Sequence, residues 1–343
     1  MDGTPVADHG AWPGVSVIIP VAGDGKGPGR WPAVSSMERQ RYPGPLEVIV
    51  VSAREVADDP GLPPEATGKV RNLSAGVRRA RHPVLLFCDA DVEAPSGLVR
   101  DLVRALSDPG TGLAYALPCW TGGQSLPALF LEAWANAQVG TFLLPATRLA
   151  SRLPVTGAVV ALPRAVLGQV GGVAALAGYL ADDARLGELV QAAGYRAAPR
   201  GWVQVRTGDP AWSECLGAVL RWLLTLRHHT PVAYAVSYLT HWVAAALVWG
   251  AAVEMRGGSP GQAWLPLVLV ALLRILLSAL PPLRAGAGGV WPAVLTPLAD
   301  LLAVPLWPVP LFARRITWAG TTYLVLKEGR VKPAPGPLPG RLG

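Results

Sequence analysis

The sequence predicts an α/β domain with a mainly parallel sheet, followed by helical membrane segments. Between residues 15 and 106, short apolar runs alternate with stretches of helical periodicity, a pattern typical of strands joined by helices. Between residues 231 and 313, charged side chains almost disappear, although 15% of the whole chain is charged. An ordinary soluble domain carries about 25% charged residues, so we expect a portion of this chain to lie in a bilayer.

Apolar runs bounded by turn residues predict three buried strands. These runs are VSVIIPV at 15–21, LEVIVVSA at 46–53 and VLLFCDAD at 84–91. Helices are expected at 31–43, 69–82 and 96–106, with loops at 23–30 and 57–68. Sheets of this kind bind ligands beyond the carboxyl ends of their strands, so those ends are the first place to look for a site.

Asp89 and Asp91 lie where the third predicted strand ends. On a strand, residues i and i+2 point to the same side, so the two carboxylates would repel each other unless a cation shares them. Mg²⁺ and Mn²⁺ suit such oxygen ligands and keep open positions for phosphate oxygens. The alternative is an ordinary solvated turn after the strand, which is the commoner outcome for an isolated Asp-x-Asp.

A second acidic pair, Asp182 and Asp183, stands just before a helical pattern. Carboxylates there are favourable with the helix dipole and can serve as a simple N-cap. The functional alternative is a general base that removes a proton from an acceptor hydroxyl. Upstream, the segment 156–172 has a glycine-containing turn at each end and is a candidate for a pocket wall.

The segment 211–230 predicts an amphipathic basic helix, with an apolar stripe followed by Arg221, Arg227 and two histidines. Such a helix suits the membrane interface. Its periodicity is equally compatible with a surface helix packed on the domain.

Three apolar segments follow. Residues 232–252 contain no Asp, Glu, Lys or Arg and are long enough to span a bilayer. Residues 263–280 are also long enough but contain Arg274, which must face protein, water or headgroups. Residues 290–313 hold five prolines and Asp300, which favours a broken span, two half-helices or a re-entrant segment over a straight helix.

The charge distribution predicts a multi-pass protein of the cell inner (plasma) membrane with a cytoplasmic first domain. The N-terminus has no signal-peptide pattern. Basic residues precede the first span, and the tail 314–343 holds six basic residues and one acidic residue, so both are expected inside and the number of crossings is even. The net charge of +7 then favours an anionic leaflet over nucleic acid. The predicted domains and segments are 1–210, 211–230, 231–313 and 314–343.

The order and spacing of several motifs carry a resemblance to a known family. The motifs are VSVIIPV, GKVRNLSAG, VLLFCDADV, TGAVVALPRAVLGQVGG, LADDARLGELVQAAGYR, LRW and ITWAGTTYLVLKEGRV. Together they resemble the inverting glycosyltransferases of family two, and more narrowly the ceramide glucosyltransferase group, which includes the bacterial hopanoid-associated enzymes. The resemblance implies a nucleotide-diphospho-sugar transferase domain of the GT-A type, a divalent metal (Mg²⁺ or Mn²⁺) and a nucleotide-sugar donor.

The resemblance also implies roles for individual residues. Asp89 and Asp91 match the pair that binds metal and nucleotide diphosphate, and Asp183 matches the base, with Asp182 beside it. Arg221 and Trp222 match the end of a Gln/Arg-x-x-Arg-Trp motif, although Ala218 stands at its first position. Lys69 and Asn72 match a segment that lines the donor pocket. Asp59, in the loop after the second strand, replaces an acid that the group usually carries directly after that strand.

The implied function is transfer of a hexose or N-acetylhexosamine from a nucleotide sugar, expected to be UDP-linked, to a lipid hydroxyl of a ceramide-, hopanoid- or glycerolipid-type acceptor. Two alternatives stay open. A processive polysaccharide synthase would need more spans and an intact Gln-x-x-Arg-Trp motif. A degenerate, membrane-tethered binding protein would explain Ala218 and the displaced acid.

Overall fold

The computed structural model describes residues 11–21, 31–52, 61–150, 153–238, 241–318 and 321–334. The chain divides into two compact units, each described here by itself. The first unit comprises residues 1–119 and 143–206, and the second comprises 120–142 and 207–343. The loop predicted at 23–30, and some residues of the one predicted at 57–68, lie outside the described residues.

The first unit is built on a sheet that has seven strands among the described residues, in the order β2-β1-β3-β6-β5-β7-β4. The strands are β1 (Val15–Val21), β2 (Leu46–Ser52), β3 (Val84–Cys88), β4 (Val92–Glu93), β5 (Thr111–Thr121), β6 (Val159–Pro163) and β7 (Arg196–Arg206). Strand β1 pairs in parallel with β2 and β3, whereas β6 runs antiparallel to both β3 and β5. Strands β2, β1, β3 and β5 therefore share one direction, and the predicted α/β fold with a mainly parallel sheet is confirmed.

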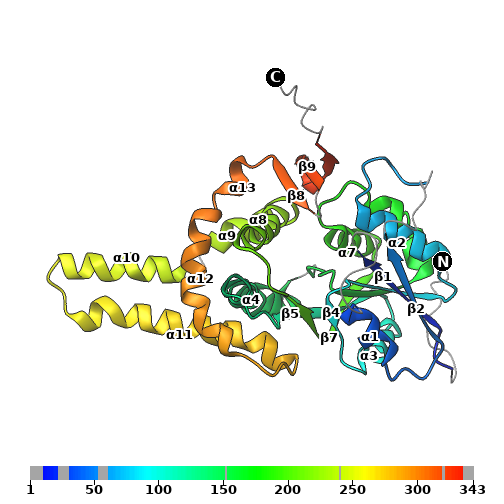
Figure 1. The fold of residues 1–343 in the computed structure, drawn as a ribbon, viewed down its shortest axis with the longest axis horizontal. Coiled ribbons are helices and arrows are strands. Elements are labelled where there is room, and N and C mark those ends of the chain that lie inside the picture. Colours follow the sequence, from blue (N-terminus) through cyan, green and yellow to red (C-terminus); the bar gives the residue numbers. More distant parts are fainter. Residues whose placement is uncertain are drawn as a thin grey trace. The chain divides into compact units, whose positions relative to one another are not determined.

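Helices cover both faces of this sheet. The helices of the first unit are α1 (Pro32–Glu38), α2 (Gly68–Arg79), α3 (Leu98–Leu106), α5 (Leu144–Leu149), α6 (Arg164–Gln169) and α7 (Asp182–Ala192), with a 3₁₀ turn η3 (Val173–Leu176). Helices α1 and α3 lie on one side of the strands, and α2 and α7 lie on the other (Figure 1). Helix α2 approaches β1 so closely that a Cβ at Gly76 would stand 2.3 Å from Cγ2 of Ile18, so this position requires glycine.

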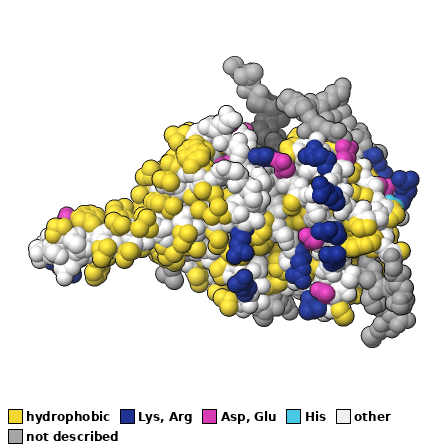
Figure 2. Space-filling view, turned by 90° about the horizontal axis from the view of Figure 1, so that it is seen from below, with side chains coloured by type: hydrophobic (Ala, Val, Ile, Leu, Met, Phe, Trp, Pro, Cys, Tyr) yellow, Lys and Arg dark blue, Asp and Glu magenta, His cyan; other side chains and the backbone are white. Residues whose placement is uncertain are grey.

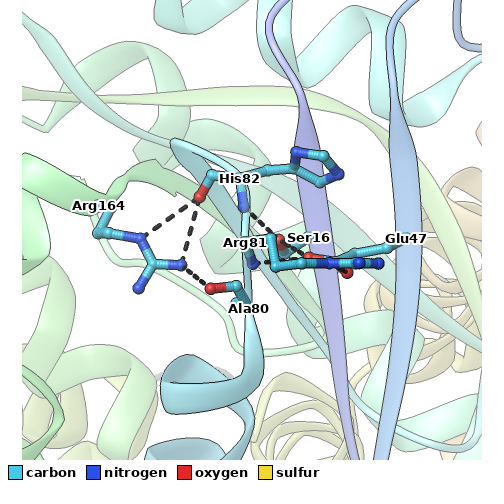
Figure 3. A network of polar contacts seen from close by, with 6 residues as sticks. All are labelled: Ser16, Glu47, Ala80, Arg81, His82 and Arg164. Atoms are coloured by element: carbon cyan, nitrogen blue, oxygen red, sulfur yellow. Dashed lines mark hydrogen bonds and ion pairs between the residues drawn. The ribbon is translucent and has the colours of Figure 1, made fainter.

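A polar network closes the edge of the sheet where β1, β2 and β3 begin (Figure 3). The Glu47 carboxylate accepts hydrogen bonds from Ser16 Oγ at 2.6 Å and from Arg81 Nε at 2.9 Å. Ser16 Oγ in turn accepts from the backbone N of His82, and Arg164 donates to the His82 carbonyl. Burial opposes ionisation of Glu47, but these hydrogen bonds outweigh it and lower its pKa to about 2. The network has a structural role at the N-terminal ends of these strands, and the carboxyl ends of the strands remain for a ligand.

The second unit is mainly helical. Its helices are α4 (Leu126–Gln138), the π-turn η2 (Val139–Leu143, whose last residue belongs to the first unit), α8 (Trp212–His229), α9 (Pro231–Ser237), α10 (Trp242–Met255), α11 (Pro260–Arg284), η5 (Trp291–Leu295), α12 (Thr296–Ala303), η6 (Val304–Leu306) and α13 (Val309–Phe312). Strands β8 (Arg315–Trp318), β9 (Thr321–Val325) and β10 (Val331–Pro333) form a small antiparallel sheet, with η7 (Lys327–Gly329) between the last two.

Three stretches among the described residues are long and apolar enough to cross a membrane: Pro231–Met255, Pro260–Arg284 and Trp291–Phe312. Helices α10 and α11 form an antiparallel hairpin (Figure 1), and hydrophobic side chains cover much of its visible surface (Figure 2). The third stretch is divided into η5, α12, η6 and α13, each with a proline at one of its first two positions. Proline is tolerated there because the first helical N–H groups have no intrahelical partner.

Arg274 of α11 and Asp300 of α12 form a buried bidentate ion pair. The Arg274 Nε lies 2.6 Å from Asp300 Oδ2, and Nη2 lies 2.7 Å from Oδ1. The third guanidinium nitrogen, Nη1, donates to Thr141 Oγ1 at 2.5 Å. The arginine in the second apolar stretch thus faces protein, one of the environments expected from its sequence, and is fully buried.

Candidate active site

The chain turns at the carboxyl end of β3, and the two predicted metal ligands lie in this turn. Strand β3 ends at Cys88, and the backbone N of Asp89 donates to the carbonyl of Ala158 at 3.0 Å. A hydrogen bond from the N of Val92 to the carbonyl of Asp89 closes a turn that includes Asp91. The strand is therefore shorter than expected, because the chain must reverse for β4 to pair with β7. A tight turn, and not strand alternation, brings Asp89 and Asp91 near each other.

Lys69, in the first turn of α2, joins the two acidic pairs. Its Nζ lies 2.8 Å from Asp89 Oδ1 and 3.5 Å from Asp182 Oδ2. Burial favours the neutral amine, but the charges of Asp182, Asp89 and Asp183 outweigh it and raise the pKa of Lys69 well above its usual range. The lysine therefore stays charged and supplies a cation that the carboxylates share.

Asp182 and Asp183 are the first two residues of α7. Burial is the largest influence on Asp183 and the charge of Asp182 the next; together they raise the pKa of Asp183 to about 6, although Lys69 opposes them. A carboxylate with this pKa is ionised at neutral pH and still accepts a proton readily, as a general base must.

These residues share one cavity of about 310 Å³ in the first unit. Its lining residues are Pro20, Lys69, Leu73, Phe87, Cys88, Asp89, Gly157, Val160, Leu176, Asp182, Asp183 and Leu186. The cavity thus lies near the carboxyl ends of β1 and β3, the edge at which α/β sheets bind ligands. Of the residues singled out in the sequence, the structure brings together Lys69, Asp89, Asp182 and Asp183.

Gly157 is a site residue whose role could not be read from the sequence. A Cβ at this position would stand 2.7 Å from Asp183 Oδ2 and 2.9 Å from its Cγ. The glycine therefore allows the Asp183 carboxyl group to lie against the backbone. The only signal was its place at the start of the segment 156–172, which was expected to shape a pocket wall. The contact between Gly157 and Asp183 joins regions of the chain that are distant in sequence, so the sequence alone could not show it.

Replacing Gly157 with alanine should displace the Asp183 carboxylate and lower activity by about tenfold or more, since misplacing a reacting group is costly. Gly168 on α6 is the matched control, because a Cβ there would meet nothing within 4 Å. Turnover of the two alanine variants is the measurement. Equal activity of G157A and G168A would show that the close approach does not matter.

Replacing Lys69 with methionine should lower the melting temperature and reduce turnover roughly ten- to hundredfold, because removing the cation of a partly buried ion cluster leaves its carboxylates uncompensated. Arg78, exposed on the same helix, provides the control variant Arg78→Met. Thermal unfolding and turnover of both variants test this. A K69M protein with the melting temperature and turnover of R78M would contradict a shared-cation role.

The other predicted site residues have different surroundings. Asn72 is buried, its Nδ2 donates to the carbonyl of Val21 at 3.0 Å, and it does not line the cavity. Asp91 is exposed in the turn. Asp59 lies outside the described residues.

Arg221 and Trp222 lie on α8, in the second unit. The Trp222 ring stacks on Trp134, with centroids 6.0 Å apart and planes 3° from parallel. It also packs at a tilt against Trp120, with centroids 5.1 Å apart. Trp222 is thus fixed between two aromatic neighbours.

An α/β sheet of this kind, with an acidic cavity near the carboxyl ends of its strands, agrees with the nucleotide-diphospho-sugar transferase domain expected from the sequence. The family model named Glycosyl transferase family 21 matches residues 39–331. The chain therefore belongs to this ceramide glucosyltransferase-like family, and the resemblance seen in the sequence is confirmed.

Several solved structures are similar to this chain. A crystal structure described as a mycobacterial protein is 18% identical, with 63% of this chain and 74% of that chain covered and a TM-score of 0.39. Glucosyl-3-phosphoglycerate synthase from Mycobacterium tuberculosis, in complex with Mn²⁺, UDP and phosphoglyceric acid, is 19% identical over 62% of this chain and 78% of that chain, with a TM-score of 0.36. Its complex with Mn²⁺ and UDP-glucose is 19% identical over 63% and 79%, with a TM-score of 0.37.

Proposed function

We propose that this glycosyltransferase transfers a hexose or N-acetylhexosamine from a nucleotide sugar, UDP-linked, to the hydroxyl group of a membrane lipid. The observation that carries the proposal is a cavity in which a base of raised pKa lies beside a lysine–carboxylate cluster, on a chain with three membrane-length apolar stretches. Membership of a ceramide glucosyltransferase-like family supports a lipid acceptor.

Asp183 is the proposed general base. It takes the proton from the lipid hydroxyl as the hydroxyl oxygen attacks the anomeric carbon of the sugar. The bond to the nucleotide diphosphate breaks in the same displacement, so the configuration of that carbon inverts and no sugar–enzyme bond forms. Gly157 leaves room for the Asp183 carboxyl group to hold this position.

Lys69 is the proposed source of fixed positive charge in the cavity. It compensates Asp89 and Asp182, so these carboxylates do not repel an incoming diphosphate. Charge that is fixed before the reaction stabilises developing negative charge effectively. Arg221 is proposed to add a further positive charge near the diphosphate, with Trp222 beside it, while Asn72 and Asp59 are proposed to support the donor site.

Asp89 and Asp91 would hold Mg²⁺ or Mn²⁺. Two carboxylates in one tight turn supply the oxygen ligands that these ions prefer. No group of three or more potential metal ligands occurs among the described residues, so phosphate oxygens and water would complete the coordination. A bound divalent ion would neutralise charge on the departing diphosphate.

The acceptor side of the proposal rests on the second unit. The amphipathic helix α8 would lie in the cytoplasmic interface, and the region 231–313 would cross an even number of times, with the basic tail 314–343 inside. The domain formed by residues 1–210 would then work at the cytoplasmic face of the inner membrane. Ceramide, hopanoid and diacylglycerol are the acceptor classes that fit such an interface.

Transfer of radiolabelled sugar from UDP-sugars to membrane lipid extracts tests the function. We expect an organic-soluble labelled product that is lost in Asp91→Ala, and lipid mass spectrometry of cells that express either protein should identify it. A water-soluble labelled polymer would instead indicate a polysaccharide synthase. Tight Mn²⁺-dependent UDP binding without turnover on any lipid would indicate a binding protein.

The pH dependence of turnover should reflect Asp183. A base must be ionised, and the pKa of Asp183 is raised to about 6. Turnover should therefore be constant above about pH 7 and fall as the pH drops through 6, approaching tenfold per pH unit. Initial rates from pH 5 to 8 measure this, and melting temperatures over the same range show whether the protein stays folded. A flat profile down to pH 5 would exclude Asp183 as the titrating base.

A further inference from the structure

An apolar groove of about 340 Å³ lies in the second unit between α4, α8 and the segment α12–η6. Its lining consists of apolar side chains and one cysteine, among them Phe130, Trp134, Trp212, Leu216 and Leu302. No charged side chain lines it. Every lining residue belongs to the second unit, so the groove is separate from the acidic cavity of the first unit.

Contacts within the protein fix the walls of the groove. The rings of Phe130 and Trp212 pack at a tilt with centroids 5.5 Å apart, and Trp134 is buried and stacked on Trp222. The Cys215 thiol donates to the carbonyl of Pro127 at 3.3 Å. A polar ligand would thus find little to hydrogen-bond, whereas an apolar ligand would meet a preformed surface.

The groove opens on an apolar rim. Trp212, Leu216 and Leu302 are 40%, 39% and 46% exposed. Leu302 belongs to the stretch Trp291–Phe312, one of those with the length and composition of a membrane span. Exposed large apolar residues on such a segment indicate that the groove opens to hydrocarbon and not to water.

We propose that this groove binds one aliphatic chain of the lipid acceptor. Helix α8 has the polarity of an amphiphile, because Trp212 and Leu216 line the groove and Arg227 follows on the same side of the helix, about three turns beyond Leu216. The aliphatic chain would lie in the groove, with the polar headgroup toward Arg227. This inference rests on the proposed function, since it takes the acceptor to be a lipid.

Photo-cross-linking tests the groove without requiring sugar transfer. The full chain is reconstituted in phosphatidylcholine vesicles that contain ceramide with a diazirine in its acyl chain, and adducts are mapped by mass spectrometry. We expect adducts on α8 and α12 that excess unlabelled ceramide suppresses at least fivefold more than equal excess phosphatidylcholine. Adducts on the α10–α11 hairpin, which report bulk lipid, should respond equally to both. Groove adducts that behave like hairpin adducts would overturn the proposal.

Two variants narrow the groove: Leu216→Trp at the exposed rim, and Ala303→Leu at the buried wall. Each buried methylene is worth about fourfold in affinity, so losing contact with two or more should weaken ceramide cross-linking about tenfold. Ala251→Trp, exposed on α10, is the matched control and should change little. Should Ala303→Leu fail to fold, Leu216→Trp carries the test alone, because the half-exposed rim position accommodates the larger ring while the ring still covers the mouth of the groove. Undiminished cross-linking in L216W would overturn the proposal.

Chain-length dependence separates this inference from the proposed function. With ceramides of six and sixteen acyl carbons as acceptors, L216W should raise KM for the long chain about tenfold and leave KM for the short chain and kcat nearly unchanged. Equal effects on both chain lengths would overturn the groove and leave lipid transfer intact. Saturable groove adducts without sugar transfer to ceramide would support the chain site while the proposed transfer to ceramide fails.

Discussion

Asp183→Asn should lower kcat by about 10²–10⁴-fold, the usual contribution of a general base. The amide is close in shape to the carboxyl group but accepts no proton at neutral pH. Because Lys69 and Asp89 keep their 2.8 Å contact, binding of the nucleotide should change little. Single-turnover transfer rates and calorimetric titration with UDP measure the two effects separately.

The stability of the same variant distinguishes a catalytic role from a structural one. The pKa of Asp183 is about 6 in the folded protein, above the roughly 3.9 of an unfolded chain. Asp183 therefore makes its full contribution to stability when the pH is below the pKa of the unfolded chain. This contribution is lost as the pH rises through 6. At pH 7.5, D183N removes this unfavourable charge and should melt no lower than wild type.

Asp108→Asn, at an exposed position after α3, is the matched control for this charge change. It should retain wild-type turnover. Wild-type turnover in D183N would remove Asp183 as the base, whereas low turnover together with a large drop in melting temperature would point to a structural carboxylate.

The strands next to the site could be predicted because their signals are local. The predicted runs 15–21 and 46–53 agree with β1 and β2 to within one residue. Buried apolar runs bounded by proline, glycine or polar residues need no knowledge of distant partners. Strand β3 ended early because β4 pairs with β7, about 110 residues later in the chain, a distance at which the sequence pattern carries no information.

The site residues show the same division. Residue type and spacing singled out Asp89 and Asp183. They also indicated that neighbouring carboxylates such as Asp89 and Asp91 need a cation to share. Lys69 supplies part of this positive charge, and its contacts with Asp89 and Asp182 depend on how α2 and α7 pack on the sheet. Likewise, the cost of an arginine in an apolar segment predicted that Arg274 must face something polar, but its partner Asp300 emerges only from the packing of α11 on α12.

Arg274→Met should lower the free energy of unfolding by about 3–5 kcal/mol, because it leaves the Asp300 carboxylate buried without a counter-charge. Asp300→Leu should cost a similar amount, since it leaves the guanidinium of Arg274 unpaired. Arg284→Met, at an exposed position on the same helix, should cost little. Denaturation in detergent micelles, followed by circular dichroism and tryptophan fluorescence, gives the free energies.

The double variant R274M/D300L is the decisive comparison. Apolar replacements of both partners of a buried pair are often neutral or stabilising, so the double variant should lose much less than the sum of the two single losses. The Arg274 guanidinium also donates a hydrogen bond to Thr141. The neighbouring Gly140 lies so close to α11 that a Cβ added there would stand 2.1 Å from the Leu277 carbonyl oxygen. If the pair mainly neutralises buried charge, the double variant should recover most of the stability. If the single losses simply add, Arg274 and Asp300 stabilise the unit independently and do not act as a pair.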